Sequence, residues 1–191
     1  LELSVLKRDL ALASSSLPIR TASTSIANSE ATSLPLAGRC IGIIDYGMGN
    51  QQSLINAFGH LGAATVLSSK IAKIEDTDLI VLPGVGAFPE GMAQLKLRFL
   101  DSFLHQWALD GRPLIGICLG MQMLFESSEE FRETPGLDLL QGKVKSLSSD
   151  HVGGEQLVLP HVGWNQLSSG PAAPHTTDYE SLNQYFVHSY V

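Results

Sequence analysis

The residues best suited to chemistry gather around Cys118, within the run Gly116-Ile117-Cys118-Leu119-Gly120. An apolar segment precedes this run and a helical pattern follows it, which predicts a strand–turn–helix junction. A nucleophile on such an elbow needs small residues two positions to either side, because the tightly turned backbone is approached closely. A helix N-terminus behind the thiol favours the thiolate and leaves N–H groups to bind an oxyanion. Spacing alone leaves two interpretations open: Cys118 is a nucleophile, or it is a core residue between two glycines.

A second candidate element is Pro83-Gly84-Val85-Gly86, which follows another apolar segment. Ligands of parallel sheets bind outside the carboxyl ends of the strands, so we expect this loop to share a rim with Cys118. Its glycines would let a backbone N–H turn toward a reacting carbonyl and supply half of an oxyanion hole. An isolated P-G-x-G is also an ordinary strand–helix turn. Gly47-Met48-Gly49-Asn50 should end the first strand on the same rim, but it has neither a dinucleotide-binding fingerprint nor a P-loop lysine.

Alternating apolar segments and helical patterns predict the elements that position these loops. Strands are expected at 40–45, 64–67, 78–82 and 114–117. Asn50 can cap a helix that ends at Gly62, and a helix is expected at 121–126. A single long helix ending at Gly111 is expected to carry an apolar stripe at a spacing of four: Leu95, Phe99, Phe103 and Trp107.

Short apolar strands separated by helices predict an α/β fold, with a flavodoxin-like, mostly parallel sheet and helices on both faces. After about residue 136 the sequence favours strands, at 143–147, 156–160, 162–167 and 185–191. We therefore expect a strand-rich C-terminal extension, built as a meander or an antiparallel addition.

Composition and charge exclude several classes of function. The 191 residues are 44% hydrophobic and 16% charged, which is typical of a folded domain. Twelve Lys and Arg against 19 Asp and Glu give a formal charge of −7, so bulk charge does not favour nucleic acid or an anionic membrane. No apolar run is long enough for a spanning helix. Two cysteines make neither a disulfide framework nor a zinc site, and we expect no metal or organic cofactor.

Residues 1–38 differ from the rest of the chain. They hold eight Ser and three Thr and carry no net charge, so the whole −7 belongs to residues 39–191. The segment lacks the apolar core of a secretory signal, and its three acidic residues are unusual for a plastid transit peptide. We expect a disordered or non-native N-terminal extension, with a transit peptide as the alternative.

Longer motifs resemble a known family. G-I-C-L-G-M-Q is similar to the nucleophile motif of the class I (triad) glutamine amidotransferases. The segments D-Y-G-M-G-N, L-P-G-V-G-A-F-P-E-G-M, P-H-V-G-W-N and Y-F-V-H-S-Y resemble, more narrowly, the glutaminase subunits of imidazole glycerol phosphate synthases. The resemblance covers residues 41–191, in the order that the family has them.

The resemblance implies a role for each matched position. Cys118 would attack the side-chain amide of glutamine, forming a γ-glutamyl thioester and releasing ammonia. The backbone N–H groups of Leu119 and of Val85 or Gly86 would bind the oxyanion. Three side chains would hold the glutamine substrate: Gln122, Glu130 and Ser189. Glu130 would do so by its negative charge. By residue type alone, Gln122 is an exposed helix residue and Glu130 belongs to a solvated acidic run.

The general base and its carboxylate come, in this family, from a late H-P-E segment. None of the six histidines in residues 1–191 is followed by x-E: 60, 105, 151, 161, 175 and 188. His188 lies in the separate motif Y-F-V-H-S-Y and is not assigned as the base. We expect residues 39–191 to form an amidotransferase domain that is incomplete at its C-terminus, so that this chain alone is inactive.

The implied function is glutamine hydrolysis that feeds ammonia to a (β/α)8-barrel cyclase subunit in a heterodimer. That partner would make imidazole glycerol phosphate and aminoimidazole carboxamide ribotide in histidine biosynthesis. The expected location is the cytoplasm, or alternatively a plastid. Two rivals remain open: a glutaminase subunit of another pathway, and a non-catalytic subunit that only binds a partner.

Overall fold

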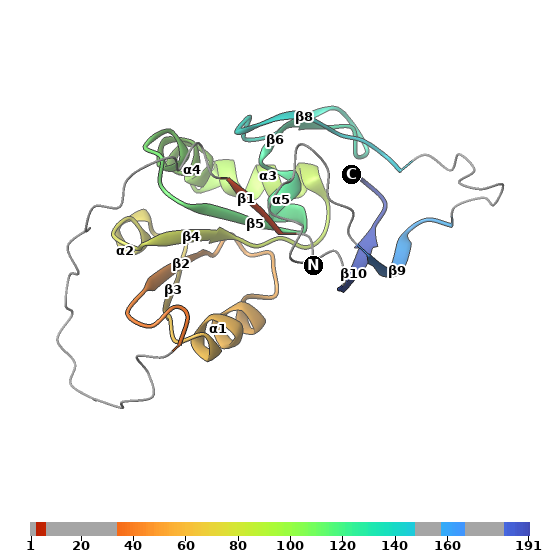
Figure 1. Ribbon diagram of the computed structural model, residues 1–191. Coiled ribbons are helices and arrows are strands. Elements are labelled where there is room, and N and C mark those ends of the chain that lie inside the picture. Colours follow the sequence, from red (N-terminus) through yellow and green to blue (C-terminus); the bar gives the residue numbers. More distant parts are fainter. Residues whose placement is uncertain (1–2, 7–33, 148–157, 167–181) are drawn as a thin grey trace.

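The computed structural model describes residues 3–6, 34–147, 158–166 and 182–191, arranged around a five-stranded sheet (Figure 1). The strand order is β1-β5-β4-β2-β3. Strands β2 to β5 are parallel to one another, and β1 is antiparallel to β5. The bounds are Leu3–Leu6 for β1, Cys40–Ile44 for β2, Ala64–Ser68 for β3, Leu79–Leu82 for β4 and Leu114–Ile117 for β5. The four parallel strands follow the flavodoxin-like order, which confirms the predicted fold class.

Strand β1 departs from the expectation of disorder in residues 1–38. Leu3–Leu6 pairs with the whole of β5, from Leu3 opposite Ile117 to Leu6 opposite Leu114. Without β1, strand β5 would present a row of unpaired N–H and C=O groups at the edge of the sheet. For these four residues the expectation was wrong, because an open edge accepts a short apolar segment as a further strand.

Helices cover both faces of the sheet, as predicted (Figure 1). Helix α1, Gln51–His60, lies on one face, where Leu54, Ile55 and Phe58 pack on a small core. Helices α3, α4 and α5 lie on the other face over the larger core. The remaining helices are α2 at Ile71–Ile74, α3 at Phe88–Leu97, α4 at Leu100–Leu109 and α5 at Leu119–Gln122. Because side chains alternate along a strand, Ile43 faces the α1 core and Ile44 the larger one.

The single long helix that the spacing predicted is in fact two helices, α3 and α4. Phe99 separates them with φ 57°, and its side chain is 74% exposed instead of joining the stripe. A spacing of four drifts by roughly 40° per step around a helix of 3.6 residues per turn, so three steps rotate the stripe by about 120°. The break resets the rotation, and both Leu95 and Trp107 are thereby buried.

The helix expected at 121–126 is also wrong. Helix α5 ends at Gln122, and Phe125–Ser128 forms strand β6. This strand pairs in parallel with β8, Leu140–Val144, and antiparallel with β7, Thr134–Pro135. Tertiary pairing overrides the local helical pattern, because Ser127 and Ser128 are buried and the strand ladder satisfies their backbone.

The C-terminal region is rich in strands, as predicted, but with shifted bounds. Strand β8 ends three residues before the expected 143–147 segment does. Strands β9, His161–Gln166, and β10, Asn183–His188, form an antiparallel pair in place of the expected 162–167 and 185–191. The expected strand at 156–160 lies partly outside the described residues, and its described part, 158–160, is not a strand. None of the helices that the structure describes is long and apolar enough to cross a membrane.

Candidate active site

Cys118 lies at the turn between β5 and α5 and is exposed. Its backbone angles, φ 54° and ψ −119°, are ones that a residue with a Cβ rarely adopts, and such strain clusters at functional sites. The turn is closed by the Cys118 carbonyl, which accepts hydrogen bonds from Met121 N at 2.9 Å and Gln122 N at 3.1 Å. The predicted strand–turn–helix elbow is therefore present, and its thiol is not a core group.

The glycines around this elbow are required by close backbone contacts. A Cβ on Gly116 would lie 2.5 Å from Met121 Cα, and one on Gly120 would overlap the carbonyl oxygen of Leu82. A Cβ on Gly84 would lie 2.5 Å from Gly120 N. The Pro83–Gly86 loop consequently packs backbone against backbone on the elbow, on the rim where the sequence placed both.

Tyr46 holds the Pro83–Gly86 loop in place, a role that the sequence did not indicate. Its hydroxyl is buried and donates a hydrogen bond to the Pro83 carbonyl oxygen at 2.7 Å. Burial, and secondarily the nearby Cys118, raises the pKa of Tyr46 well above its ordinary value, so the hydroxyl stays a donor. The only sequence signal was a tyrosine directly after the first strand.

Of the expected oxyanion donors, Val85 lines the same cavity as Cys118, and Leu119 directly follows Cys118 in the chain. Val85 is 51% exposed, and Gly86 adopts φ +89°, a conformation that favours glycine. The N–H groups of Val85 and Gly86 donate no hydrogen bond to any described residue. Leu119 is the first residue of α5, and an N–H in the first turn of a helix lacks an intrahelical partner. Among the described residues, these loop N–H groups thus have no hydrogen-bond partner, as an oxyanion donor would require.

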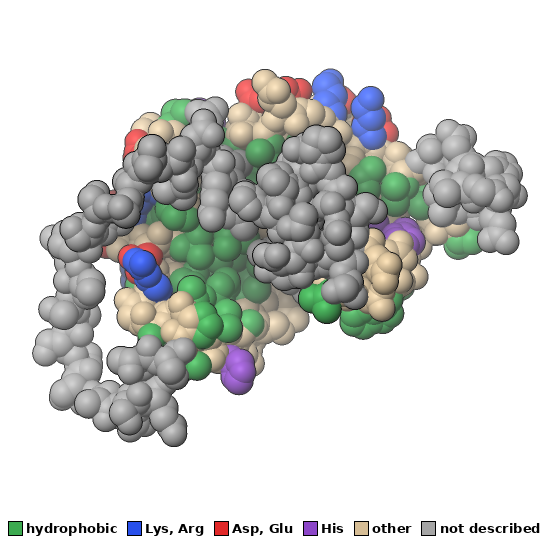
Figure 2. Space-filling model, in the orientation of Figure 1, with side chains coloured by type: hydrophobic (Ala, Val, Ile, Leu, Met, Phe, Trp, Pro, Cys, Tyr) green, Lys and Arg blue, Asp and Glu red, His purple; other side chains and the backbone are tan. Residues whose placement is uncertain are grey.

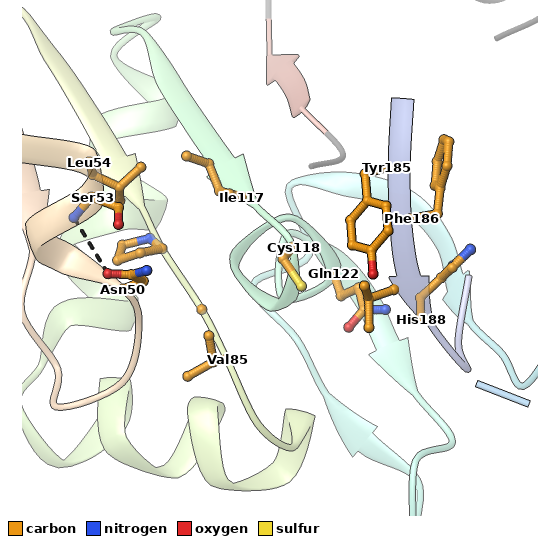
Figure 3. A pocket seen from close by; sticks show the side chains of 13 residues that line it. Asn50, Ser53, Leu54, Val85, Ile117, Cys118, Gln122, Tyr185, Phe186 and His188 are labelled. Carbon is orange, nitrogen blue, oxygen red and sulfur yellow. Dashed lines mark hydrogen bonds between the residues drawn. The ribbon is translucent and has the colours of Figure 1, made fainter. Parts of the chain in front are cut away.

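A cavity of about 280 Å³ opens over the thiol (Figure 3). In Figure 3, Tyr185 points from β10 toward Cys118 and Gln122, and Asn50, the residue before α1, lies across the cavity. The volume is near the lower end of ligand pockets and suits a molecule of amino-acid size. The lining comes from α1, the Pro83–Gly86 loop, the β5–α5 elbow and β10: Asn50, Ser53, Leu54, Pro83, Gly84, Val85, Ile117, Cys118, Gln122, Tyr185, Phe186, Val187 and His188.

Of the residues expected to hold glutamine, Gln122 alone lines this cavity. Its Nε2 donates to the Tyr190 carbonyl oxygen at 3.0 Å. Ser189 is half-buried and its carbonyl accepts from Leu147 N at 2.8 Å. Glu130 Oε2 accepts a hydrogen bond from Phe88 N at 2.7 Å, which caps the start of α3. Neither Ser189 nor Glu130 is among the lining residues.

The two cysteines differ in environment. Cys40, at the start of β2, is partly buried, and burial followed by the charge of Asp78 raises the pKa of its thiol. Because the thiolate is the nucleophile, a raised pKa lowers the reactivity of Cys40 at neutral pH. The exposed Cys118 is thus the better placed of the two thiols.

Two histidines of the β9–β10 pair approach the cavity, and His188 lines it. His188 Nε2 lies 3.1 Å from His161 Nδ1, and His188 Nδ1 lies 3.3 Å from the Tyr190 carbonyl oxygen. His60 and His105 lie on the surface, on α1 and α4. His151 and His175 fall outside the described residues. Within the described ranges, no three His, Cys, Asp or Glu side chains gather as a metal site would require.

An elbow cysteine facing a glycine loop across a small cavity, on a flavodoxin-like sheet, is the arrangement of a cysteine-dependent amidotransferase. Residues 42–191 match the family model described as "Glutamine amidotransferase class-I". The match covers well over half of the chain, and the chain belongs to this family.

Curated relatives show which members of this family the chain is similar to. The chain is 45% identical over 152 residues to the "Imidazole glycerol phosphate synthase subunit HisH" of Halalkalibacterium halodurans, covering 79% of this chain and 71% of that protein. It is 45% identical over 150 residues to the subunit of the same name from Bacillus subtilis, covering 78% and 71%. The Lactococcus lactis subunit HisH is 47% identical over 150 residues, again covering 78% and 71%. Within the family, the chain is similar to HisH subunits.

Proposed function

We propose that residues 39–191 form a glutaminase domain in which Cys118 is the nucleophile. The thiolate attacks the side-chain amide carbon of glutamine, and a C–S bond forms as the carbonyl becomes an oxyanion. Collapse of this intermediate expels the amide nitrogen, which takes up a proton and leaves as ammonia. Water then cleaves the γ-glutamyl thioester to give glutamate and regenerate the thiol.

Backbone N–H groups are proposed to stabilise the oxyanion. Leu119 offers one N–H from the start of α5, and Val85 or Gly86 offers the other from the facing loop. Donors that are already held in place cost no reorganisation during the reaction, and the loss of one typically costs roughly 10²–10³ in rate. The buried Tyr46 hydroxyl supports this role, because it holds the loop at Pro83.

Three side chains are proposed to hold the amino-acid head of glutamine. Gln122 already lines the cavity, and Ser189 follows His188, which lines it too. Glu130 would pair with the substrate ammonium through the carboxylate oxygen that Phe88 N does not use. No H-x-E segment occurs in residues 1–191, so no residue is assigned here as general base.

The observation that carries the proposal is the strained, exposed Cys118 directly opposite the Pro83–Gly86 loop. A glutamine-like chloroketone is the direct probe, because it binds as glutamine does and alkylates a thiol beside the pocket. Mass spectrometry should place the adduct on Cys118 and find none in Cys118→Ser. An adduct on Cys40 instead, in the wild-type chain, would refute the assignment and favour a non-catalytic, partner-binding subunit.

We further propose that the chain delivers ammonia to a (β/α)8-barrel cyclase subunit, as a heterodimer in the cytoplasm. The names of the relatives, which are subunits of imidazole glycerol phosphate synthase, support a partner of this kind. Ammonia is mostly protonated in neutral water and is then not nucleophilic, so a glutaminase works usefully only when it is docked to a dry channel. The products would be imidazole glycerol phosphate and aminoimidazole carboxamide ribotide, in histidine biosynthesis.

The proposed docking face comprises Gly47–Asn50, Asn56 and 160–165. Trp164 suits an interface anchor, since it is 68% exposed and its ring lies 5.3 Å from that of Tyr185. Figure 2 shows hydrophobic side chains gathered beside a histidine at the β9–β10 end of the molecule. Co-purification with a cyclase subunit should weaken at least tenfold in Trp164→Ala. Leu97→Ala, which alters an equally exposed residue on α3, should leave the affinity unchanged.

A further inference from the structure

The hydrogen bonds of β9 and β10 form a chain with a fixed direction. Asn165 Nδ2 lies 3.2 Å from His161 Nε2, His161 Nδ1 lies 3.1 Å from His188 Nε2, and His188 Nδ1 lies 3.3 Å from the Tyr190 carbonyl oxygen. The same carbonyl accepts a hydrogen bond from Gln122 Nε2 at 3.0 Å. This series of hydrogen bonds therefore runs from an exposed residue of β9 to a side chain that lines the cavity.

The proton positions in this series of hydrogen bonds follow from its last acceptor, the Tyr190 carbonyl oxygen. A carbonyl oxygen only accepts, so His188 Nδ1 carries the proton that it donates to Tyr190. In the neutral imidazole Nε2 then has a lone pair, and His161 Nδ1 must donate to it. By the same reasoning, His161 Nε2 accepts from Asn165. A single pair of tautomers satisfies all three contacts.

This arrangement also fixes the orientation of Gln122. Its Nε2 faces Tyr190, so its Oε1 is the group left for a ligand, and that oxygen forms no hydrogen bond with the described residues. An amide oxygen accepts from an ammonium group, whereas a flipped amide would present two donors and repel it. The strand pairing places His161 directly opposite His188, so the register itself holds the two rings together.

We propose that His188 is a positioning residue for glutamine binding: with His161 and Asn165 behind it, it holds the Tyr190 carbonyl and thereby keeps Gln122 Oε1 turned toward the ligand ammonium. This inference rests on the proposed glutaminase function. It assigns His188 to ground-state binding of the amino-acid head and gives it no part in the reaction at Cys118.

Two substitutions separate this role from a merely structural one. In His188→Asn the side-chain amide nitrogen lies near the former Nδ1 and can still donate to Tyr190. In His188→Gln the amide lies near the former Nε2, so the donor to Tyr190 is lost while polarity and size are largely retained. His105→Gln, at an exposed position of α4, is the matched control.

The assay is alkylation of Cys118 in the whole chain by the L-chloroketone over a range of concentrations. His188→Gln should raise the half-saturating concentration by roughly three- to tenfold, the worth of one lost hydrogen bond, with an unchanged maximal rate. His188→Asn and His105→Gln should stay within about twofold of wild type. Alkylation by iodoacetamide, which has no amino-acid head, should be the same in all four proteins.

Three outcomes would overturn the inference. One is equal half-saturation in His188→Gln and wild type. Another is an equal loss in both His188 variants together with a lower thermal midpoint, which would mean a structural role only. The third is a change in the maximal rate alone. A wild-type chain that shows no saturation with the chloroketone would refute the proposed function itself, and the wild-type curve alone reveals that case.

Discussion

Gly84→Ala tests whether the contact between the Pro83–Gly86 loop and the elbow sets the geometry around Cys118. Gly84 is buried and needs no positive φ, so the substitution acts through space alone. The added Cβ would lie 2.5 Å from Gly120 N and 2.7 Å from Leu119 Cβ, where ordinary contact begins at 3.4 Å. Gly120 and Leu119 both belong to the elbow, so the clash is relieved only if the loop and the elbow separate by roughly an ångström.

Two magnitudes follow from this separation. Overpacking of this kind costs about 1–3 kcal/mol of unfolding free energy, because neither backbone can yield freely. A displacement of about 1 Å between an oxyanion donor and the reacting carbon can cost about 10²-fold in rate. We therefore expect chloroketone labelling of Gly84→Ala to slow by up to about a hundredfold, with iodoacetamide labelling of the exposed thiol little changed.

The assay is the pair of labelling rates, followed by mass spectrometry, beside a urea denaturation curve. Gly59→Ala is the matched control, since a Cβ there meets nothing within 4 Å and the position lies in the last turn of α1. At that position it should raise the unfolding free energy by at most roughly 0.5–1 kcal/mol and leave both labelling rates unchanged. Chloroketone labelling of Gly84→Ala within twofold of wild type would show that the loop does not position the site.

Three further predictions concern the same loop and the chemistry beside it. Tyr46→Phe removes the buried hydrogen bond to the Pro83 carbonyl and should lower the unfolding free energy in urea by about 1–3 kcal/mol; an unchanged curve would contradict the role of Tyr46. Gly86→Ala places a Cβ at φ +89°, at a cost of about 1–2 kcal/mol. In a complex with the cyclase, this variant should reduce the stimulation of glutaminase turnover by the partner's ligand more than it reduces glutamine binding, which kinetics with and without that ligand will measure. Residues 1–191, in which no H-x-E segment occurs, should release glutamate slowly, since a thiol without a general base forgoes roughly 10²–10⁴ in rate; turnover comparable to that of the Bacillus subtilis HisH subunit would mean that one of the histidines present serves as the base.

Features that depend on neighbouring residues could be predicted from the sequence. The apolar runs gave the parallel strands, and Asn50 does cap α1, with Oδ1 accepting from Ser53 N at 3.4 Å. The glycines two positions to either side of Cys118 indicated the tight elbow, because close approach excludes a Cβ wherever it occurs. Such signals lie within a few residues of the feature that they predict.

Features that depend on distant pairing could not be predicted in the same way. Tyr46 and Pro83 are 37 positions apart, Phe88 and Glu130 are 42 apart, and His161 and His188 are 27 apart. The break at Phe99 is likewise determined by the core that α3 and α4 share, and no glycine or proline at that point of the sequence indicates it. Each of these contacts is decided by the sheet order and strand register, which local patterns do not contain.

The central claim is that the cavity over Cys118 binds glutamine and presents its side-chain amide to the thiol. Protection measures this most directly: the L-chloroketone alkylates the chain while L-glutamine or D-glutamine is added in increasing concentration. We predict that L-glutamine slows the modification of Cys118 to a saturable limit, that D-glutamine does not, and that iodoacetamide modification of Cys40 is unaffected by either. Equal protection by the two enantiomers, or none by L-glutamine, would contradict it.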